Sequence, residues 1–287
     1  MSTATSSGPP LHDFLPGTQI EIINPSLERG RVCSALFDFD GTLSLIREGW
    51  QQVMIPMMVE ILLGLSTGET EDQLTTVVTD YVDRLTGKQT IYQMIELADQ
   101  VKNRGGEPRD PLEYKHVYLD RLWERIKGRV AALKSGEVAP DDMLLSGSRE
   151  LLTALADREV VLYLASGTDL QYVQDEARAL QVDRFFGDRI YGALDDYKRF
   201  SKALIIGQII TTHHLSGSAL LTFGDGYVEI ENTKQVGGLA VGVASDEACR
   251  EGINDWKRAR LIGAGADIII PEFREHQALL EYLFTPG

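Results

Sequence analysis

Two aspartates, Asp38 and Asp40, directly follow an apolar run over residues 32–37 and precede Gly41 and Thr42. The apolar run predicts a fully buried strand, and side chains two residues apart on an extended chain share a face. Gly41 suits a sharp departure of the backbone from a sheet. Ligands of α/β sheets bind at the carboxyl ends of the strands, so the two carboxylates indicate a reactive site there. The alternative is an Asp-Gly turn that closes a hairpin.

Two later segments also follow predicted strands. Ser166, Gly167 and Thr168 come after residues 160–165, and a hydroxyl beside glycine-freed backbone N–H groups suits phosphate oxygens. An ordinary helix N-cap is an equally good interpretation of Thr168, but not of Ser166. The second segment, residues 224–229, follows a strand predicted over residues 219–223 and carries two more acids.

The segment Asp38-Phe39-Asp40-Gly41-Thr42 resembles the D-x-D-G-T signature of the haloacid dehalogenase-like hydrolases, which are mostly Mg²⁺-dependent phosphatases. The resemblance covers residues 32–45 and 148–273, where the family's motifs recur in the family's order, each near the end of a predicted strand. The placement of a helical segment after the first motif is similar to phosphoglycolate phosphatases and beta-phosphoglucomutases.

The resemblance implies a role for each acid. Asp38 would be the nucleophile and Asp40 the general acid and base. Mg²⁺ would be held by Asp38, the backbone carbonyl of Asp40, and Asp225. Glu229 stands where the family often has Asp, which implies a contact with the metal through a water molecule. Hard oxygen ligands of this kind suit Mg²⁺.

The resemblance also implies residues that bind the phosphoryl group, namely Thr42, Ser166, Gly167 and one lysine. Two lysines, Lys198 and Lys202, lie at the entrance to a helix predicted over residues 201–214. We favour Lys202, because a residue at a helix start is held more firmly than one in the preceding loop. A solvated surface lysine is the alternative for either residue taken alone.

The chain divides into three parts by pattern. Residues 1–31 are expected to form a partly flexible leader, residues 32–45 and 148–287 the core, and residues 46–147 a helical cap. The core alternates strand and helix patterns, which predicts a doubly wound, mostly parallel, Rossmann-like α/β sheet. The cap shows four amphipathic helices. Thr70 is a candidate N-cap of the second, and a capping box from Thr90 to Gln93 is expected to open the third.

Composition indicates an ordinary globular protein, with 43% hydrophobic and 25% charged residues. The net charge of −15 argues against nucleic-acid and anionic-membrane partners. Cys33 and Cys249 suit a reducing compartment, and we expect both thiols to be buried. The longest apolar stretch, residues 53–65, is too short to span a bilayer, and no signal peptide is visible. A cytoplasmic monomer or homodimer is expected.

We therefore predict a Mg²⁺-dependent phosphomonoester hydrolase that acts on a small phosphorylated metabolite through an aspartyl-phosphate. Two alternatives are a phosphomutase on the same scaffold and a non-catalytic binding protein that retains the fold. A dehalogenase is disfavoured, since it has no use for a general acid at Asp40. Arg47, just past the first motif, is expected to contact the leaving group of the substrate, and packing of the linker is an equal alternative.

Overall fold

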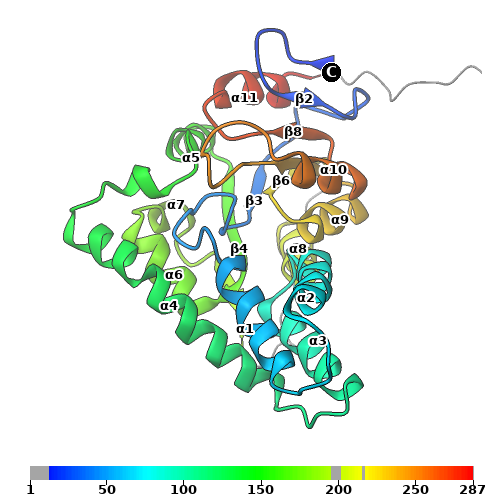
Figure 1. Ribbon diagram of the computed structural model, residues 1–287. Helices are drawn as coiled ribbons and strands as arrows, with labels where there is room; N and C mark the ends of the chain where they lie inside the picture. The colour runs from blue at the N-terminus through cyan, green and yellow to red at the C-terminus, as the bar shows by residue number, and fades with distance from the viewer. Residues whose placement is uncertain (1–12, 195–201, 215–216, 287) are drawn as a thin grey trace, which may run out of the picture.

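The computed structural model describes residues 13–194, 202–214 and 217–286. These residues fold around a central eight-stranded sheet (Figure 1). The strand order is β1-β2-β8-β7-β6-β3-β4-β5. The strands are β1 (Asp13–Phe14), β2 (Glu21–Ile22), β3 (Ser34–Phe37), β4 (Val161–Asp169), β5 (Ile190–Ala193), β6 (Leu220–Gly224), β7 (Leu239–Val243) and β8 (Ile268–Ile270). Strands β3 to β8 pair in parallel, and β1 and β2 extend the β8 edge in antiparallel fashion. The predicted fold class is confirmed.

Strand β3 lies where the order of connections reverses, because the chain next adds β4 on one side and β6 on the other. Phe37 is in register with Leu164 of β4 and with Phe223 of β6. The residues that follow these three positions therefore leave the sheet at the same edge. This is the switch point at which doubly wound sheets bind ligands.

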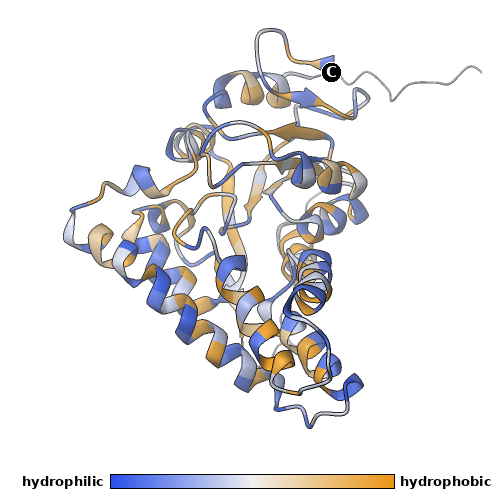
Figure 2. Ribbon diagram, in the orientation of Figure 1, coloured by the Kyte–Doolittle hydropathy of each residue, from blue (hydrophilic) through white to orange (hydrophobic). Residues whose placement is uncertain are grey.

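Helices cover both faces of the sheet. They are α5 (Ser148–Ala156), α6 (Leu170–Ala179), α7 (Asp183–Phe186), α8 (Lys202–His213), α9 (Tyr227–Gln235), α10 (Asp255–Gly263) and α11 (His276–Phe284). Alternation along β3 sends Leu36 into one apolar cluster with α8, and Phe37 into a second with α5 and α6. Phe37 stacks on Phe223 with ring centroids 4.7 Å apart. Figure 2 shows the apolar strands between these helices.

Four of the helices between β3 and β4 lie together, and Figure 1 places them away from β2 and α11. They are α1 (Gln51–Leu63), α2 (Glu71–Leu85), α3 (Thr90–Asn103) and α4 (Pro111–Ser135). Thr70 caps α2 through a capping box with Gln73, as predicted. The box predicted at Thr90 is wrong: Thr90 is already helical, and the N-cap residue, Gln89, makes no side-chain capping bond.

Short 3₁₀ helices at Pro140–Met143 and Gly217–Ala219 complete the described secondary structure. Both cysteines are exposed, so the prediction of buried thiols is wrong. Cys33 immediately precedes β3, and Cys249 lies in the loop after β7, where neither thiol reaches the core. Among the described residues, no helix combines the length and apolar character needed to span a membrane.

Candidate active site

Three carboxylates converge at the ends of β3 and β6. Asp38 follows β3, Asp225 follows β6, and Glu229 lies in the first turn of α9. One carboxylate oxygen from each of them lies within 4.8 Å of the others. Asp38 is only 7% exposed and Glu229 only 1%. Three negative charges this close together call for a cation, because their mutual repulsion is weakly screened in a buried site.

The donor set fits Mg²⁺, since all three side chains offer hard oxygen atoms and few protein ligands leave room for waters. Glu229 Oε1 accepts a hydrogen bond of 2.7 Å from the backbone N–H of Gly226, which fixes the carboxylate at the start of α9. The backbone N–H of Asp225 donates to Thr42 Oγ1 at 3.0 Å. The segment that begins at Asp38 and the one that contains Asp225 are thus joined directly.

Asp40 also follows β3 but has different neighbours. Its Oδ2 accepts hydrogen bonds from the hydroxyls of Ser166 and Thr168, at 3.0 and 2.9 Å. Its Oδ1 is buried and accepts no hydrogen bond from the described residues. This oxygen lies 3.7 Å from Nε of Arg47. The Asp40 carboxylate is therefore held from one side and faces a cation on the other.

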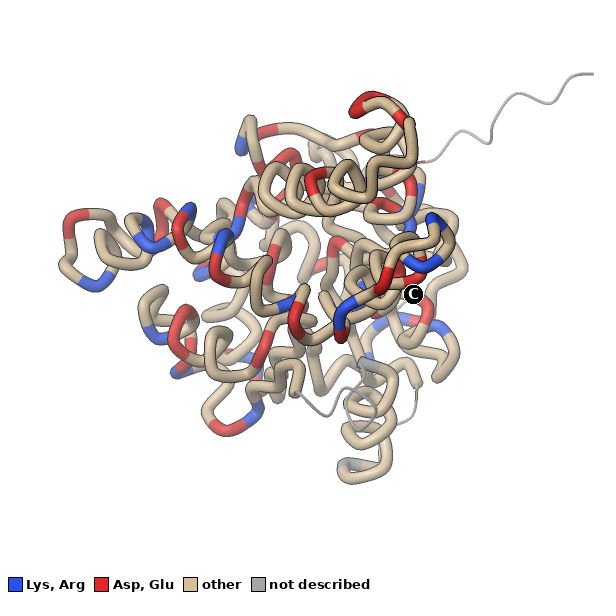
Figure 3. The backbone as a smooth tube through the Cα atoms, turned by 60° about the horizontal axis from the view of Figure 1, so that its bottom comes forward, with Lys and Arg blue, Asp and Glu red and all other residues tan. Residues whose placement is uncertain are grey.

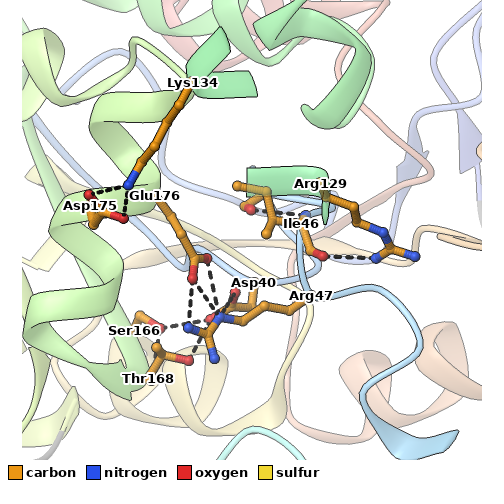
Figure 4. A network of polar contacts seen from close by, with 10 residues as sticks. Asp40, Ile46, Arg47, Arg129, Lys134, Ser166, Thr168, Asp175 and Glu176 are labelled. Atoms are coloured by element: carbon orange, nitrogen blue, oxygen red, sulfur yellow. Dashed lines mark hydrogen bonds and ion pairs between the residues drawn. The ribbon is translucent and has the colours of Figure 1, made fainter. Parts of the chain in front are cut away.

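Arg47 is buried and forms a two-nitrogen ion pair with Glu176 of α6, with distances of 2.6 to 3.1 Å (Figure 4). Burial opposes the charge of the Arg47 guanidinium, but the carboxylates of Glu176 and Asp40 raise its pKa above the ordinary value. Burial raises the pKa of Glu176, and Arg47 partly offsets this change. Arg47 thus remains a fixed cation beside Asp40, with most of its charge balanced by Glu176.

A further lysine reaches the acid cluster from α10. Lys257 Nζ lies 2.8 Å from Asp225 Oδ2 and 2.6 Å from Glu247 Oε1. Burial opposes the charge on Lys257, but these two carboxylates raise its pKa. Ser245, which follows β7, donates a hydrogen bond of 3.0 Å to the backbone carbonyl of Gly41. Residues after β7 therefore brace both the first motif and Asp225.

Asp38, Asp40 and Asp225 line a pocket of about 110 Å³, which also contacts helices α1, α3 and α4. Beyond the site acids, it is lined by the hinge and helical side chains Arg47, Trp50, Met54, Thr90, Gln93, Tyr118 and Leu122, by the loop residues Thr86, Gly87 and Lys88, and by Ser166, Gly167 and Thr168. The lining combines apolar side chains with charged ones. Such a pocket suits a small molecule with an anionic reacting end.

The structure brings most of the predicted residues together. Thr42 is fully buried, and its hydroxyl meets Asp225. Gly167 lines the pocket, where an added Cβ would lie 3.3 Å from the backbone oxygen of Lys88. Lys198 lies outside the described residues, and Lys202 begins α8 with a side chain that is also outside them. The choice between the two lysines stays a prediction.

Thr168 corrects one interpretation and adds a residue to the site. It belongs to β4, whereas Asp169 is the N-cap of α6, so the N-cap interpretation of Thr168 is wrong. Its hydroxyl instead shares Asp40 with Ser166. The sequence signal was the hydroxyl two positions beyond Ser166 on an extended segment, which places both on one face.

Sequence reasoning missed Glu176, Glu247 and Lys257. Glu176 is an acid on the apolar side of α6, a pattern that asks for a buried partner. Lys257 and Glu247 follow β7, a strand end at the same sheet edge, which could have drawn attention to them. Their partners are far away in the sequence, so the spacing carried no local signal.

The molecule is thus a doubly wound sheet with carboxylates at its switch point and an inserted group of four helices, α1 to α4, after β3. A family model described as haloacid dehalogenase-like hydrolase matches residues 34–237. The chain belongs to this family, and the predicted membership is confirmed. No curated protein matches the chain.

Solved structures with the same fold cover most of the chain. A predicted phosphoglycolate phosphatase from Haemophilus somnus 129pt is 16% identical with a TM-score of 0.56, and covers 87% of this chain and 98% of its own. Beta-phosphoglucomutase from Clostridium difficile is 12% identical with a TM-score of 0.56, and covers 88% and 95%. CbbY from Rhodobacter sphaeroides, solved with xylulose-(1,5)bisphosphate, is 18% identical with a TM-score of 0.54, and covers 85% and 96%.

Proposed function

We propose that this chain is a Mg²⁺-dependent phosphatase that hydrolyses a small phosphorylated metabolite through an aspartyl-phosphate on Asp38. The observation that carries the proposal is that one pocket holds two carboxylates with different neighbours. Asp38 stands among the acids Asp225 and Glu229, whereas Asp40 is held by hydroxyls beside Arg47. A nucleophile and a proton-transfer group need such different surroundings.

In the proposed reaction, a carboxylate oxygen of Asp38 attacks phosphorus while the bond to the leaving oxygen breaks. Asp40 gives its proton to the departing alkoxide. It then takes a proton from the water that attacks the phosphorus of the aspartyl-phosphate, which releases inorganic phosphate and restores Asp38. Ser166 and Thr168 hold Asp40 in reach of both events.

A Mg²⁺ ion bound to Asp38, Asp225, Glu229 and the carbonyl of Asp40 would neutralise charge on the phosphoryl oxygens. The chain itself contributes the positions of the carboxylates. Thr42, Gly226 and Lys257 each hold one of these acids through a hydrogen bond or an ion pair. We also assign Lys202 to the phosphoryl group, by resemblance to the family.

The pocket favours hydrolysis over phosphoryl transfer within a sugar phosphate. A mutase needs a binding site for a second phosphate, yet among the described lining residues the cations are Arg47 and Lys88. Arg47 is balanced by Glu176, which leaves Lys88 for an additional anionic group of the substrate. The phosphomutase alternative keeps support from the fold shared with beta-phosphoglucomutase and CbbY.

We further propose a cytoplasmic protein with no nucleic-acid partner, a monomer or homodimer. The net charge of −15 supports the lack of a nucleic-acid partner, and Figure 3 shows acidic and basic residues interspersed along the helices. Phosphate backbones attract proteins through clustered positive charge, which the overall charge opposes.

The proposal is tested by incubating the enzyme with Mg²⁺ and a panel of phosphomonoesters that includes sugar 1-phosphates. Phosphorus NMR follows free phosphate and positional isomers in the same sample. We expect free phosphate to appear from at least one compound, and only when Mg²⁺ is present. An isomer that forms faster than free phosphate would favour the mutase, and no turnover of any compound would favour a binding protein.

A further inference from the structure

The guanidinium of Arg260, on the core helix α10, contacts the end of α2. It donates hydrogen bonds to the backbone oxygens of Asp83, Arg84 and Thr86, the last two at 2.9 Å. Helix C-termini leave such carbonyls without partners and carry partial negative charge, so a cation is favourable there. The contact joins the inserted helices to the core.

Two aromatic rings orient the guanidinium. Its carbon lies 4.6 Å from the centroid of Tyr227 and 5.0 Å from that of Trp256, both of which belong to the core. Stacking on two rings restricts a flexible side chain and adds cation–π attraction. Arg260 is therefore oriented to donate hydrogen bonds to the carbonyl oxygens at the end of α2.

The segment that follows α2 covers the pocket. Thr86, Gly87 and Lys88 line it, and Gly87 has a φ of +96°. An added Cβ on Gly87 would lie 3.3 Å from Cα of Gly226, next to Asp225. On the other side, Gly167 approaches the backbone of Lys88 equally closely. The loop over residues 86–89 is thus enclosed between two glycines of the core.

Helix α10, which carries Arg260, also contacts the acid cluster. Lys257 lies three residues before Arg260, and residues with this spacing share a helix face. Lys257 bonds to Asp225, and Arg260 bonds to the residue that begins the covering loop. One rigid helix therefore contacts both the proposed metal site and the loop that closes over it.

We propose that Arg260 is a positioning residue that latches α2 and the loop over residues 86–89 onto the core. The latched arrangement encloses the substrate, and loss of the three hydrogen bonds shifts the population toward an open one. Substrate then binds more weakly, because only the enclosed fraction is competent. This kinetic consequence rests on the proposed function, whereas the latch itself does not.

The latch is tested by amide hydrogen exchange on the intact, substrate-free protein. Arg260→Gln removes the cation, Arg260→Lys keeps the charge but loses the planar fork, and Arg258→Gln is the matched control. Arg258 is on the same helix but pairs with Glu21 of β2, which lies between β1 and β8. We expect exchange at Thr86 and Lys88 to accelerate about 10-fold or more in Arg260→Gln and less in Arg260→Lys, with no change in Arg258→Gln.

Kinetics with p-nitrophenyl phosphate and Mg²⁺ provide a second readout. We expect KM to rise in Arg260→Gln by a larger factor than kcat falls, since the reacting groups are untouched. Unchanged exchange at Thr86 and Lys88 would overturn the latch, as would acceleration that extends equally to β6, which signals global destabilisation. A wild-type protein without phosphatase activity would overturn the proposed function alone, and the exchange experiment would still decide the latch.

Discussion

The two aspartates of the first motif are two residues apart in sequence, yet they lie in opposite surroundings. Asp38 is 7% exposed, and its carboxylate lies within 4.8 Å of those of Asp225 and Glu229. Asp40 is held by two hydroxyls and faces the Arg47 guanidinium across 3.7 Å. Crowded carboxylates favour a bound cation, and a carboxylate between hydroxyls and a balanced ion pair is placed for proton transfer. Two aspartates at the end of one strand therefore have different neighbours, which supports the different roles proposed for them.

We expect the largest effect from a substitution of Asp38, the proposed nucleophile. Asp38→Asn keeps the shape of the side chain but loses the attacking charge and one metal ligand. We expect kcat to fall by about 10³-fold or more in steady-state assays of phosphate release. A variant that keeps a tenth of wild-type activity would contradict the assignment of Asp38.

A second substitution compares the two lysines near α8. Lys202→Ala should lower kcat by about 10²-fold or more, because fixed positive charge on the transferring phosphoryl group is lost. Lys198→Ala is the matched partner, and its effect should be much smaller. The reverse order would assign the role to Lys198.

The brace behind Asp225 is expected to matter less than the reacting groups. Lys257→Met leaves Asp225 and Glu247 without their shared cation, so activity should fall by about 10- to 100-fold, as for other outer partners of metal ligands. A calorimetric titration with Mg²⁺ should show a changed affinity as well. Lys234→Met is the control, since Lys234 pairs with Asp267 away from the site. Equal losses in both variants would mean that Lys257 has only a structural role.

The ion pair of Arg47 and Glu176, beside Asp40, is expected to affect the stability of the protein. Glu176→Gln leaves the buried Arg47 without its balancing charge, which should lower the free energy of unfolding by about 3 kcal/mol or more. Chemical denaturation measures this directly. Lys134→Met breaks an exposed pair between α4 and Asp175, the neighbour of Glu176 on α6. This change should cost less than about 1 kcal/mol of unfolding free energy. Similar losses in the two variants would contradict the account of Arg47.

Much of the fold could be predicted from local sequence patterns. The buried runs before Asp38, Ser166 and Asp225 predicted three strands, and their alternation with helices predicted a parallel sheet. The carboxyl ends of such strands meet at one edge, so the acids could be placed together before any coordinates.

The partners of the site residues could not be predicted in the same way. Glu176 lies 129 residues from Arg47 and Lys257 lies 32 residues from Asp225, so no local spacing connects them. The exposure of Cys33 depends on where β3 begins, and strand ends are set by tertiary packing. Long-range side-chain pairing is decided by the folded arrangement rather than by periodicity.

The central claim, that Asp38 attacks and Asp40 moves protons, is tested most directly with Asp40→Asn and p-nitrophenyl phosphate in Mg²⁺. An aryl oxide leaves without protonation, so Asp38 should still be phosphorylated, whereas activation of the water should be slow. We predict a burst of nitrophenol equal to the enzyme concentration, followed by a slow phase. Borohydride reduction after an acid quench should then convert Asp38 to homoserine, as detected by peptide mass spectrometry. A linear time course with an unmodified Asp38 peptide, while phosphate is still released, would contradict the account.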